Sequence, residues 1–104
     1  MILITRTATF SPGKKQEAIE LWTKVTKHLN ELHPERKYAV ITRLTGERPN
    51  RITMFSWHDS VAAWGEDLQE HRADPELKAL MDEDKEKQYT VPDSLVRTLY
   101  DVAE

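Results

Sequence analysis

The stretch KYAVITRLTGERPNRITMFSWH, residues 37–58, decides the fold. Two runs rich in β-branched and aromatic residues flank the segment TGERPN at 45–50. Glycine, proline and asparagine close together mark a turn between two elements. The stretch therefore predicts an antiparallel hairpin, with one strand over 37–46 and the other over 51–58.

A strand and a helix are predicted before the hairpin. The start, MILITRTATF, is rich in β-branched residues without helical spacing, which predicts a strand over residues 2–10. Ser11 and Pro12 suit the N-cap and the first position of a helix, and Pro34 predicts its end. Between them, apolar residues recur with the spacing of a buried helical stripe; they are Ala18, Trp22, Val25, Leu29 and Leu32.

A second helical region and a last strand are predicted after the hairpin. Ser60 offers an N-cap, and the helix that follows should bury one face. The residues on that face are Val61, Trp64, Leu68 and His71. Asp74, followed by proline, interrupts this helix, and a shorter helix follows over 76–88. The segment SLVRTLYDV at 94–102 predicts the final strand.

The predicted order βαββαβ is that of the ferredoxin-like fold, an α+β architecture with a four-stranded antiparallel sheet and helices on one face. With 104 residues and no linker, we expect a single domain over 1–104. Both sides of the predicted strands carry large apolar residues, although two helices can cover only one face. A second copy is the simplest cover for the other face. Two such sheets would form an α/β barrel with room for a small ligand.

Composition narrows the classes of function. The formal net charge of −3 does not suit binding to nucleic acid or to an anionic membrane. No run approaches the roughly 20 apolar residues of a membrane helix, and the first apolar run is too short for a signal peptide. The chain has no cysteine, which excludes disulfides, thiolate metal sites and cysteine nucleophiles. These features favour a cytoplasmic protein.

Three segments resemble NIPSNAP-like proteins and, next to them, the antibiotic-biosynthesis monooxygenase (ABM) group of the dimeric α/β-barrel superfamily. They are RTATFSPGKKQEAIELW at 6–22, MFSWHDSVAAW at 54–64 and EHRADPELKAL at 70–80. The resemblance implies a homodimer with a ligand cavity. The activities of the superfamily include cofactor-free oxidation of aromatic polyketides, heme breakdown and lactone isomerisation, so the resemblance implies a cavity more than one reaction.

His71 is the candidate catalytic residue, because a neutral imidazole can act as a base near neutral pH and the resemblance places a histidine of this helix near the cavity. The heme-degrading branch also uses an asparagine on its first strand, and the first strand here has none, so we expect no heme. The thirteen-residue separation of His58 and His71 matches no usual metal-ligand spacing, so we expect no metal, and no other cofactor is expected. His58 and Asp59 point to opposite faces of a strand and make a poor dyad. His28 and His33 are expected to be solvated.

The candidate binding residues are aromatic side chains that can wall a cavity and arginines that can bind a carboxylate or phosphate. The aromatic candidates are Trp57, Trp64 and Tyr100, and the arginines, each within a predicted strand, are Arg6, Arg43 and Arg97. Since the first and last strands of this fold are neighbours, Arg6 and Arg97 should lie side by side. The alternative is that the tryptophans belong to the core and that the arginines pair with acids at the dimer interface.

Two hypotheses follow for function. The first is a small-molecule enzyme, similar to a cofactor-independent monooxygenase, with His71 as base and an anionic or aromatic ligand. The second is a non-catalytic ligand-binding or structural homodimer with a packed interface. The two hypotheses can be distinguished by one observation, which is whether His71 and at least one arginine line a cavity that is open to solvent.

Overall fold

The computed structural model describes residues 1–42 and 50–103. The elements in chain order are β1 (Ile2–Thr9), α1 (Lys15–Leu32), the short 3₁₀ helix η1 (Pro34–Arg36), β2 (Ala39–Thr42), β3 (Arg51–His58), α2 (Val61–Ala73), α3 (Pro75–Lys87) and β4 (Val96–Asp101). This confirms the predicted βαββαβ order. The second helical region is two helices, separated at the predicted proline. The predicted turn over 45–50 lies almost wholly outside the described residues.

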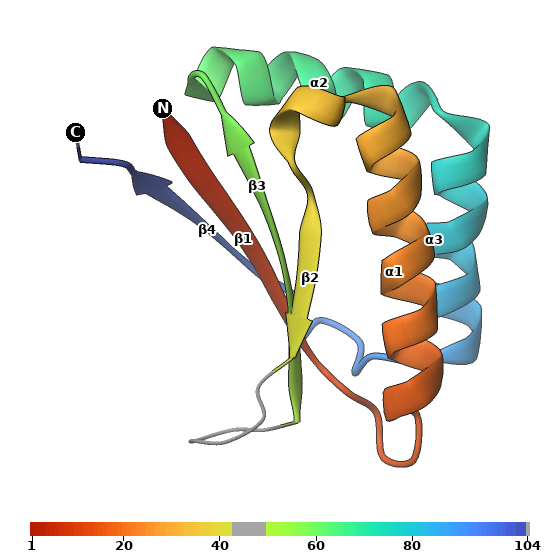
Figure 1. Cartoon of the computed structure of the whole chain (residues 1–104). Helices are drawn as coiled ribbons and strands as arrows, with labels where there is room; N and C mark the ends of the chain where they lie inside the picture. The colour runs from red at the N-terminus through yellow and green to blue at the C-terminus, as the bar shows by residue number, and fades with distance from the viewer. Residues whose placement is uncertain (43–49, 104) are drawn as a thin grey trace.

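The four strands form one antiparallel sheet in the order β2-β3-β1-β4. The hairpin pairing of β2 with β3 and the pairing of the first strand with the last are as predicted. All helices lie on one side of the sheet, and the other side is bare in the single chain (Figure 1). The register places Arg6 of β1 directly opposite both Met54 of β3 and Arg97 of β4.

Burial alternates strictly along the two central strands. Every second residue of β1 and β3 is buried, while the residues between them are only partly covered. Side chains that alternate along a strand point to opposite faces of the sheet, so the buried set faces the helices. This set includes three polar residues, Arg6, Ser56 and His58. The bare face carries Leu3 and Phe55 together with several threonines.

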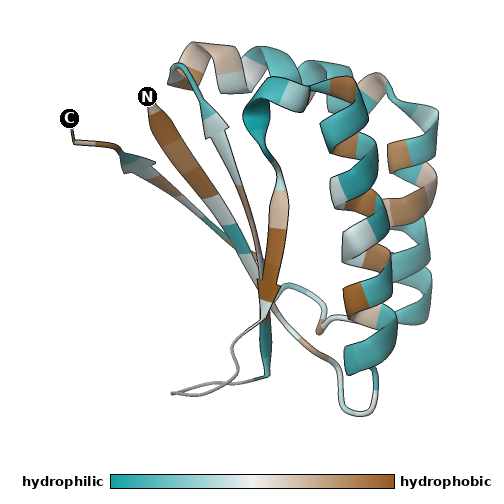
Figure 2. Ribbon diagram, viewed as in Figure 1, coloured by the Kyte–Doolittle hydropathy of each residue, from teal (hydrophilic) through white to brown (hydrophobic). Residues whose placement is uncertain are grey.

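The hydrophobic core lies between α1 and the sheet. Hydrophobic segments run along β1 and β2, while the outer helix surfaces are largely hydrophilic (Figure 2). Trp22 is in the core, as predicted, whereas Leu32 at the end of the predicted stripe is 40% exposed. Among the described residues, no helix is both long enough and apolar enough to cross a membrane.

The start of α1 differs from the prediction. Ser11 is not its N-cap, and Pro12 is not in its first turn, because the chain first makes a separate turn. The amide of Lys14 donates to the carbonyl of Ser11 at 3.0 Å, and Gly13 has a φ of +74°. Proline followed by a left-handed glycine favours such a turn, so the helix begins only at Lys15.

The second helical region begins at the predicted N-cap. The side chain of Asp74 explains why this region is divided into α2 and α3. The hydroxyl of Ser60 accepts from the Ala63 amide at 3.1 Å, as an N-cap does. Asp74 ends α2 and also caps α3, since its carboxylate accepts from the Leu77 amide at 2.9 Å. Pro75 then occupies the first turn of α3, where a missing amide hydrogen costs little.

The buried face of α2 is polar at its centre. Val61, expected on this face, is 57% exposed, and the residue of α2 that is fully buried is Asp67. Trp64 and His71 are partly covered. Asp67 is drawn inwards because its carboxylate binds groups on β3 and η1.

Candidate functional site

A pocket of about 400 Å³ lies between the helices and the side of the sheet that carries β1 and β4. Its walls are mostly aliphatic and include Leu29, Met54 and Leu77. Three of the residues singled out from the sequence, Arg6, His71 and Arg97, line this pocket together. They come from β1, α2 and β4, so only the fold brings them to one place.

Arg6 is a buried cation without a carboxylate partner. Its side chain is 7% exposed, and its Nη1 donates to the hydroxyl of Ser56 at 3.5 Å. No carboxylate of the described residues lies within 4.0 Å of its guanidinium. Burial lowers the pKa of Arg6 below its ordinary value, and the charge of Arg97 adds to this effect. An unneutralised buried charge is costly, which makes this position an attractive one for an anion.

Arg97 lies opposite Arg6 in the β1–β4 ladder and on the same face of the sheet. Its guanidinium carbon is 5.4 Å from the ring centroid of Trp64, within the range of a cation–π contact. Trp64 thus holds Arg97 at the edge of the pocket instead of forming part of the central core. Two guanidinium groups facing the same pocket give it a positive wall.

His71 contributes a neutral imidazole to the same pocket. Its ring lies 5.3 Å from the ring of His33, and its Nε2 is buried without a hydrogen-bond partner among the described residues. Burial, and then the neighbouring His33, lower the pKa of His71 to about 4. His71 is therefore neutral at pH 7, the state in which one ring nitrogen can accept a proton or a hydrogen bond.

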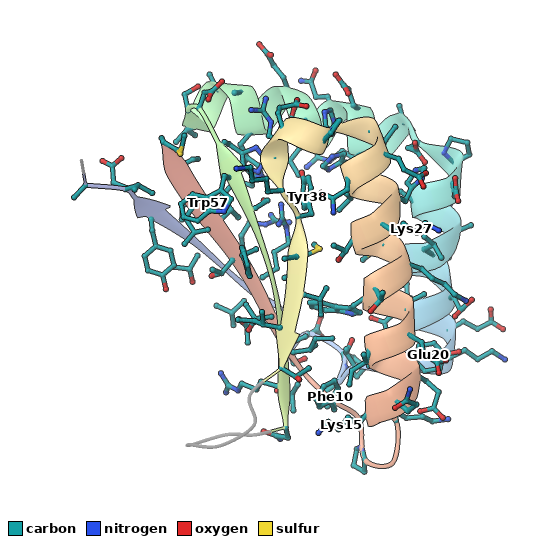
Figure 3. All side chains as sticks on the ribbon, in the orientation of Figure 1. Phe10, Lys15, Glu20, Lys27, Tyr38 and Trp57 are labelled. Atoms are coloured by element: carbon teal, nitrogen blue, oxygen red, sulfur yellow. The ribbon has the colours of Figure 1, made fainter. Side chains whose placement is uncertain are left out.

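Tyr38 contacts both His58 of β3 and the pocket residue His71 of α2. It lies between the sheet and the helices (Figure 3) and is 3% exposed. Its ring is edge-on to both His58 and His71, at centroid distances of 6.1 and 6.2 Å. Burial raises the pKa of Tyr38 to about 12, so its hydroxyl stays protonated and can donate.

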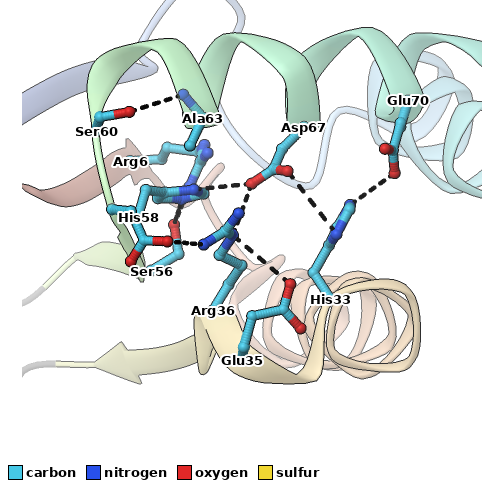
Figure 4. Close-up of polar contacts among 11 residues, drawn as sticks. Arg6, His33, Glu35, Arg36, Ser56, His58, Ser60, Ala63, Asp67 and Glu70 are labelled. Atoms are coloured by element: carbon cyan, nitrogen blue, oxygen red, sulfur yellow. Dashed lines mark hydrogen bonds and ion pairs between the residues drawn. The ribbon is translucent and has the colours of Figure 1, made fainter. Parts of the chain in front are cut away.

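A buried hydrogen-bond relay leads from Arg6 to Asp67 (Figure 4). The hydroxyl of Ser56 is 2.8 Å from Nε2 of His58, and Nδ1 of His58 is 2.9 Å from Oδ2 of Asp67. A carboxylate only accepts, so Nδ1 of His58 donates to Asp67 and its bare Nε2 accepts from Ser56. The Ser56 oxygen is then free to accept from Arg6. Burial lowers the pKa of His58 more than Asp67 raises it, so the imidazole is neutral.

Asp67 is the acidic centre of this relay. Its Oδ2 also accepts from Nε of Arg36 at 2.9 Å, and its Oδ1 lies 3.9 Å from Nδ1 of His33. His33 is 7% exposed and 3.2 Å from the carboxylate of Glu70. The expectation that His33 is solvated was therefore wrong: η1 folds back under α2 and buries it. The side chain of His28 is likewise only 11% exposed and contacts Asp74 at 2.9 Å.

The order Ser56–His58–Asp67 is that of a nucleophile triad, but the geometry does not support that role. Ser56 has no exposed surface and His58 only 1%. A nucleophilic hydroxyl must reach the substrate carbonyl, and this one is enclosed by the sheet and α2. The relay fixes the side chain that holds Arg6, so its contribution to the pocket is structural.

The carboxylate partner of His58 did not follow from the sequence. The adjacent Asp59 was the carboxylate considered, whereas the partner Asp67 comes from the next helix. The available signal was the position of Asp67 within the predicted buried face, three residues after Trp64 and four before His71. A carboxylate on a face that a helix buries requires a partner, and a nearby histidine is a natural one.

The remaining candidates are not brought to the pocket. Trp57 and Tyr100 both pair with Leu3 in the sheet and lie with it on the bare face. Trp57 is partly covered, and Tyr100 is 51% exposed. Arg43 lies outside the described residues. Among the described residues, no group of three or more histidine, aspartate or glutamate side chains is arranged to hold a metal ion.

No family model matches the chain, and no curated protein matches its sequence. Solved structures do share its fold. An uncharacterised NIPSNAP-domain protein from Burkholderia xenovorans aligns with a TM-score of 0.77 at 15% identity, over 99% of this chain and 95% of the other. The chain has the NIPSNAP/ABM fold. A NIPSNAP family protein from Agrobacterium tumefaciens aligns with a TM-score of 0.79 at 12% identity, over 99% and 86% of the two chains.

The ABM side of this fold is represented by a protein from Deinococcus radiodurans, proposed to be an antibiotic biosynthesis monooxygenase. It aligns with a TM-score of 0.71 at 18% identity, over 100% of this chain and 94% of the other. Identities this low show a shared NIPSNAP/ABM fold, and the activity of this chain has to be argued from its own site.

Because His71 is buried as a neutral imidazole, the stability of the protein should depend on pH. The unfolded chain binds a proton at this histidine below about pH 6.5, whereas the folded chain binds it only near pH 4. The unfolded state is therefore favoured as the pH falls through this window. Between pH 6.5 and pH 4, we expect the free energy of unfolding of the wild type to fall by about 2 kcal/mol more than that of the variant His71→Leu. Urea unfolding at the two pH values measures this difference. A pKa of His71 near 6.5 by NMR titration would contradict the argument.

Proposed function

We propose that this protein binds a small molecule with an anionic group and an apolar body in the pocket beneath α2 and α3. The observation that carries the proposal is Arg6, a buried guanidinium that faces the pocket without a carboxylate partner among the described residues. A carboxylate is the planar group that a guanidinium binds best. The aliphatic walls provide the complementary surface for the rest of the ligand.

The test compares two probes of nearly the same size and shape, one with a negative charge and one without. We expect benzoate to bind the wild-type protein at least about tenfold more tightly than uncharged benzamide, since a charge-assisted hydrogen bond contributes roughly 1.5–3 kcal/mol. Isothermal titration calorimetry at low salt gives both dissociation constants, and binding of ¹⁵N-labelled protein can be mapped by NMR. Equal affinities, or shifts confined to residues away from Arg6 and Arg97, would refute the proposal.

A cofactor-independent oxygenase is the second candidate. The observation that favours it is the neutral His71 at the pocket, whose Nε2 has no hydrogen-bond partner within residues 1–42 and 50–103. In such chemistry a base removes a proton from the substrate, and the resulting carbanion reacts with oxygen. Anthrone, whose methylene forms a stabilised carbanion, is a suitable probe. Oxygen uptake that the wild type supports and His71→Leu does not would support this candidate; equal uptake by both would exclude His71 as the base.

The assembly that we propose is a homodimer formed through the bare face of the sheet. This face carries partly or largely exposed apolar side chains; they are Leu3, Ile41, Phe55, Trp57, Val96 and Tyr100. An exposed apolar surface of this kind favours association. Light scattering should give twice the chain mass of 12.1 kDa, and Phe55→Lys should reduce it to that of one chain. A wild-type monomer at high concentration would refute the assembly.

A further inference from the structure

The pocket beneath α2 and α3 adjoins further hollows. A narrow hollow of about 50 Å³ adjoins it, and a third hollow of about 610 Å³ lies towards the end of α3. Met81 and Leu95 line all three hollows. Arg6 lines the first two, and Trp22 the last two. The shared walls place the three hollows next to one another, and together they are called the trough.

The length of the trough follows from α3, which forms one of its sides and runs beside α1 (Figure 1). The lining residues extend from Leu77 in the first hollow to Gln88 in the third. At about 1.5 Å per residue along a helix, this stretch is about 16 Å long. A ligand with a single small ring would occupy only the end next to Arg6.

The two ends of the trough carry opposite charges. The first hollow is lined by basic side chains and by no acidic residue; the basic ones are Arg6, Arg72, Lys78 and Arg97. Three aspartates and one lysine line the third hollow; they are Asp82, Asp84, Asp93 and Lys85. The carboxylate of Asp84 accepts from the amide and the hydroxyl of Thr90, at 3.1 and 2.8 Å. Between the ends, the neck is lined mostly by apolar groups such as Trp22, Val25 and Met54. Its charged lining residues are Arg6, shared with the first hollow, and Asp84, shared with the third.

We propose that the ligand is an elongated monocarboxylate, with its carboxylate at Arg6 and Arg97 and its apolar body extending past Met81 and Leu95 into the third hollow. This inference rests on the proposed function of the same pocket. The apolar neck excludes a hydrated polar body, and the aspartates at the far end disfavour a second anionic group. The basic and acidic ends together fix the direction in which the ligand lies.

The test uses a series of 4-alkylbenzoates from 4-methyl to 4-octyl, titrated into the wild-type protein below their micelle concentrations. We expect the affinity to rise about two- to fourfold for each added methylene. A matched dianion, with a second carboxylate at the end of the alkyl chain, should bind more weakly than the alkyl compound of the same length.

Two variants block the neck from opposite sides. Met81→Trp acts from α3, and Leu95→Trp acts from the segment before β4; both side chains are 48% exposed, so a larger ring can be accommodated without unfolding the protein. Each variant should abolish the rise of affinity with chain length, so that the 4-octyl compound binds no more tightly than the 4-methyl compound to the same variant. The comparison is made within each variant, because Met81 and Leu95 also line the first hollow. Val61→Trp, at the exposed start of α2 and outside the walls of the three hollows, is the matched control and should keep the full rise.

The outcomes separate the two proposals. If benzoate binds but affinity does not rise with chain length, or if the rise persists in both neck variants, the trough inference is wrong while the pocket remains a carboxylate site. If neither benzoate nor any alkylbenzoate binds, the proposed function itself fails. Tighter binding of the dianion would overturn the assigned direction of the ligand.

Discussion

Asp67→Ala is expected to lower the free energy of unfolding by about 3 kcal/mol, because removing one partner of a buried ionic network leaves the others uncompensated. Asp67 is 4% exposed and accepts from both Arg36 and His58 at 2.9 Å. Without it, the Arg36 guanidinium, 14% exposed, loses its buried partner. The Nδ1–H of His58 would also lose its hydrogen-bond acceptor.

Urea unfolding at pH 7 and a fixed protein concentration measures this loss of free energy. In thermal unfolding, the same loss should lower Tm by about 10–20 °C for a domain of this size. The control is Asp59→Ala, which removes the other aspartate near Arg36. Asp59 is 83% exposed and 3.8 Å from that guanidinium, so the change should stay within about 0.5 kcal/mol. If the loss in Asp67→Ala also stayed within about 0.5 kcal/mol, the relay would not contribute to stability.

Arg6→Met is expected to affect stability and binding in opposite directions. Methionine has a similar length and no charge, so the ligand-free protein should gain about 1 kcal/mol from relief of an unpaired buried charge, offset in part by the lost bond to Ser56. Benzoate binding should weaken by about thirtyfold or more, as expected when a buried partner of a charged ligand is removed.

The same two measurements on Arg97→Met provide the comparison. Arg97 is exposed at the pocket edge, so its removal should leave stability within about 0.5 kcal/mol and weaken benzoate binding less. If Arg6→Met instead destabilises the protein by more than about 1 kcal/mol, Arg6 is part of the structure and the proposed site loses its main support. Higher stability with lower affinity is the result typical of a binding site.

Local patterns in the sequence were sufficient for the elements and their order. The hairpin, the α1 stripe and the Ser60 cap each depend on residues within a few positions of one another, and period and turn chemistry are local properties. The start of α1 was misplaced because Ser11 and Pro12 suit both a helix start and a turn. Gly13 decides between them, since its left-handed conformation is incompatible with the first turn of a helix.

The site was only partly accessible from the sequence. The placement of Arg6 beside Arg97 followed from strand order, because neighbouring strands in a known topology have few possible registers. The faces of Trp57 and Tyr100 did not follow, since both strand parities carry large apolar residues. Their position on the bare face depends on which parity the helices cover.

What the sequence by itself determined was the succession of strands and helices and, through it, the ferredoxin-like fold. What only the tertiary structure decided was which polar groups meet. His58 binds Asp67 because α2 lies across β3. Arg6 binds Ser56 because the sheet register places residues 50 positions apart in contact. Such contacts depend on the packing of whole elements, whereas helix and strand patterns depend on the repeat of a few neighbouring residues.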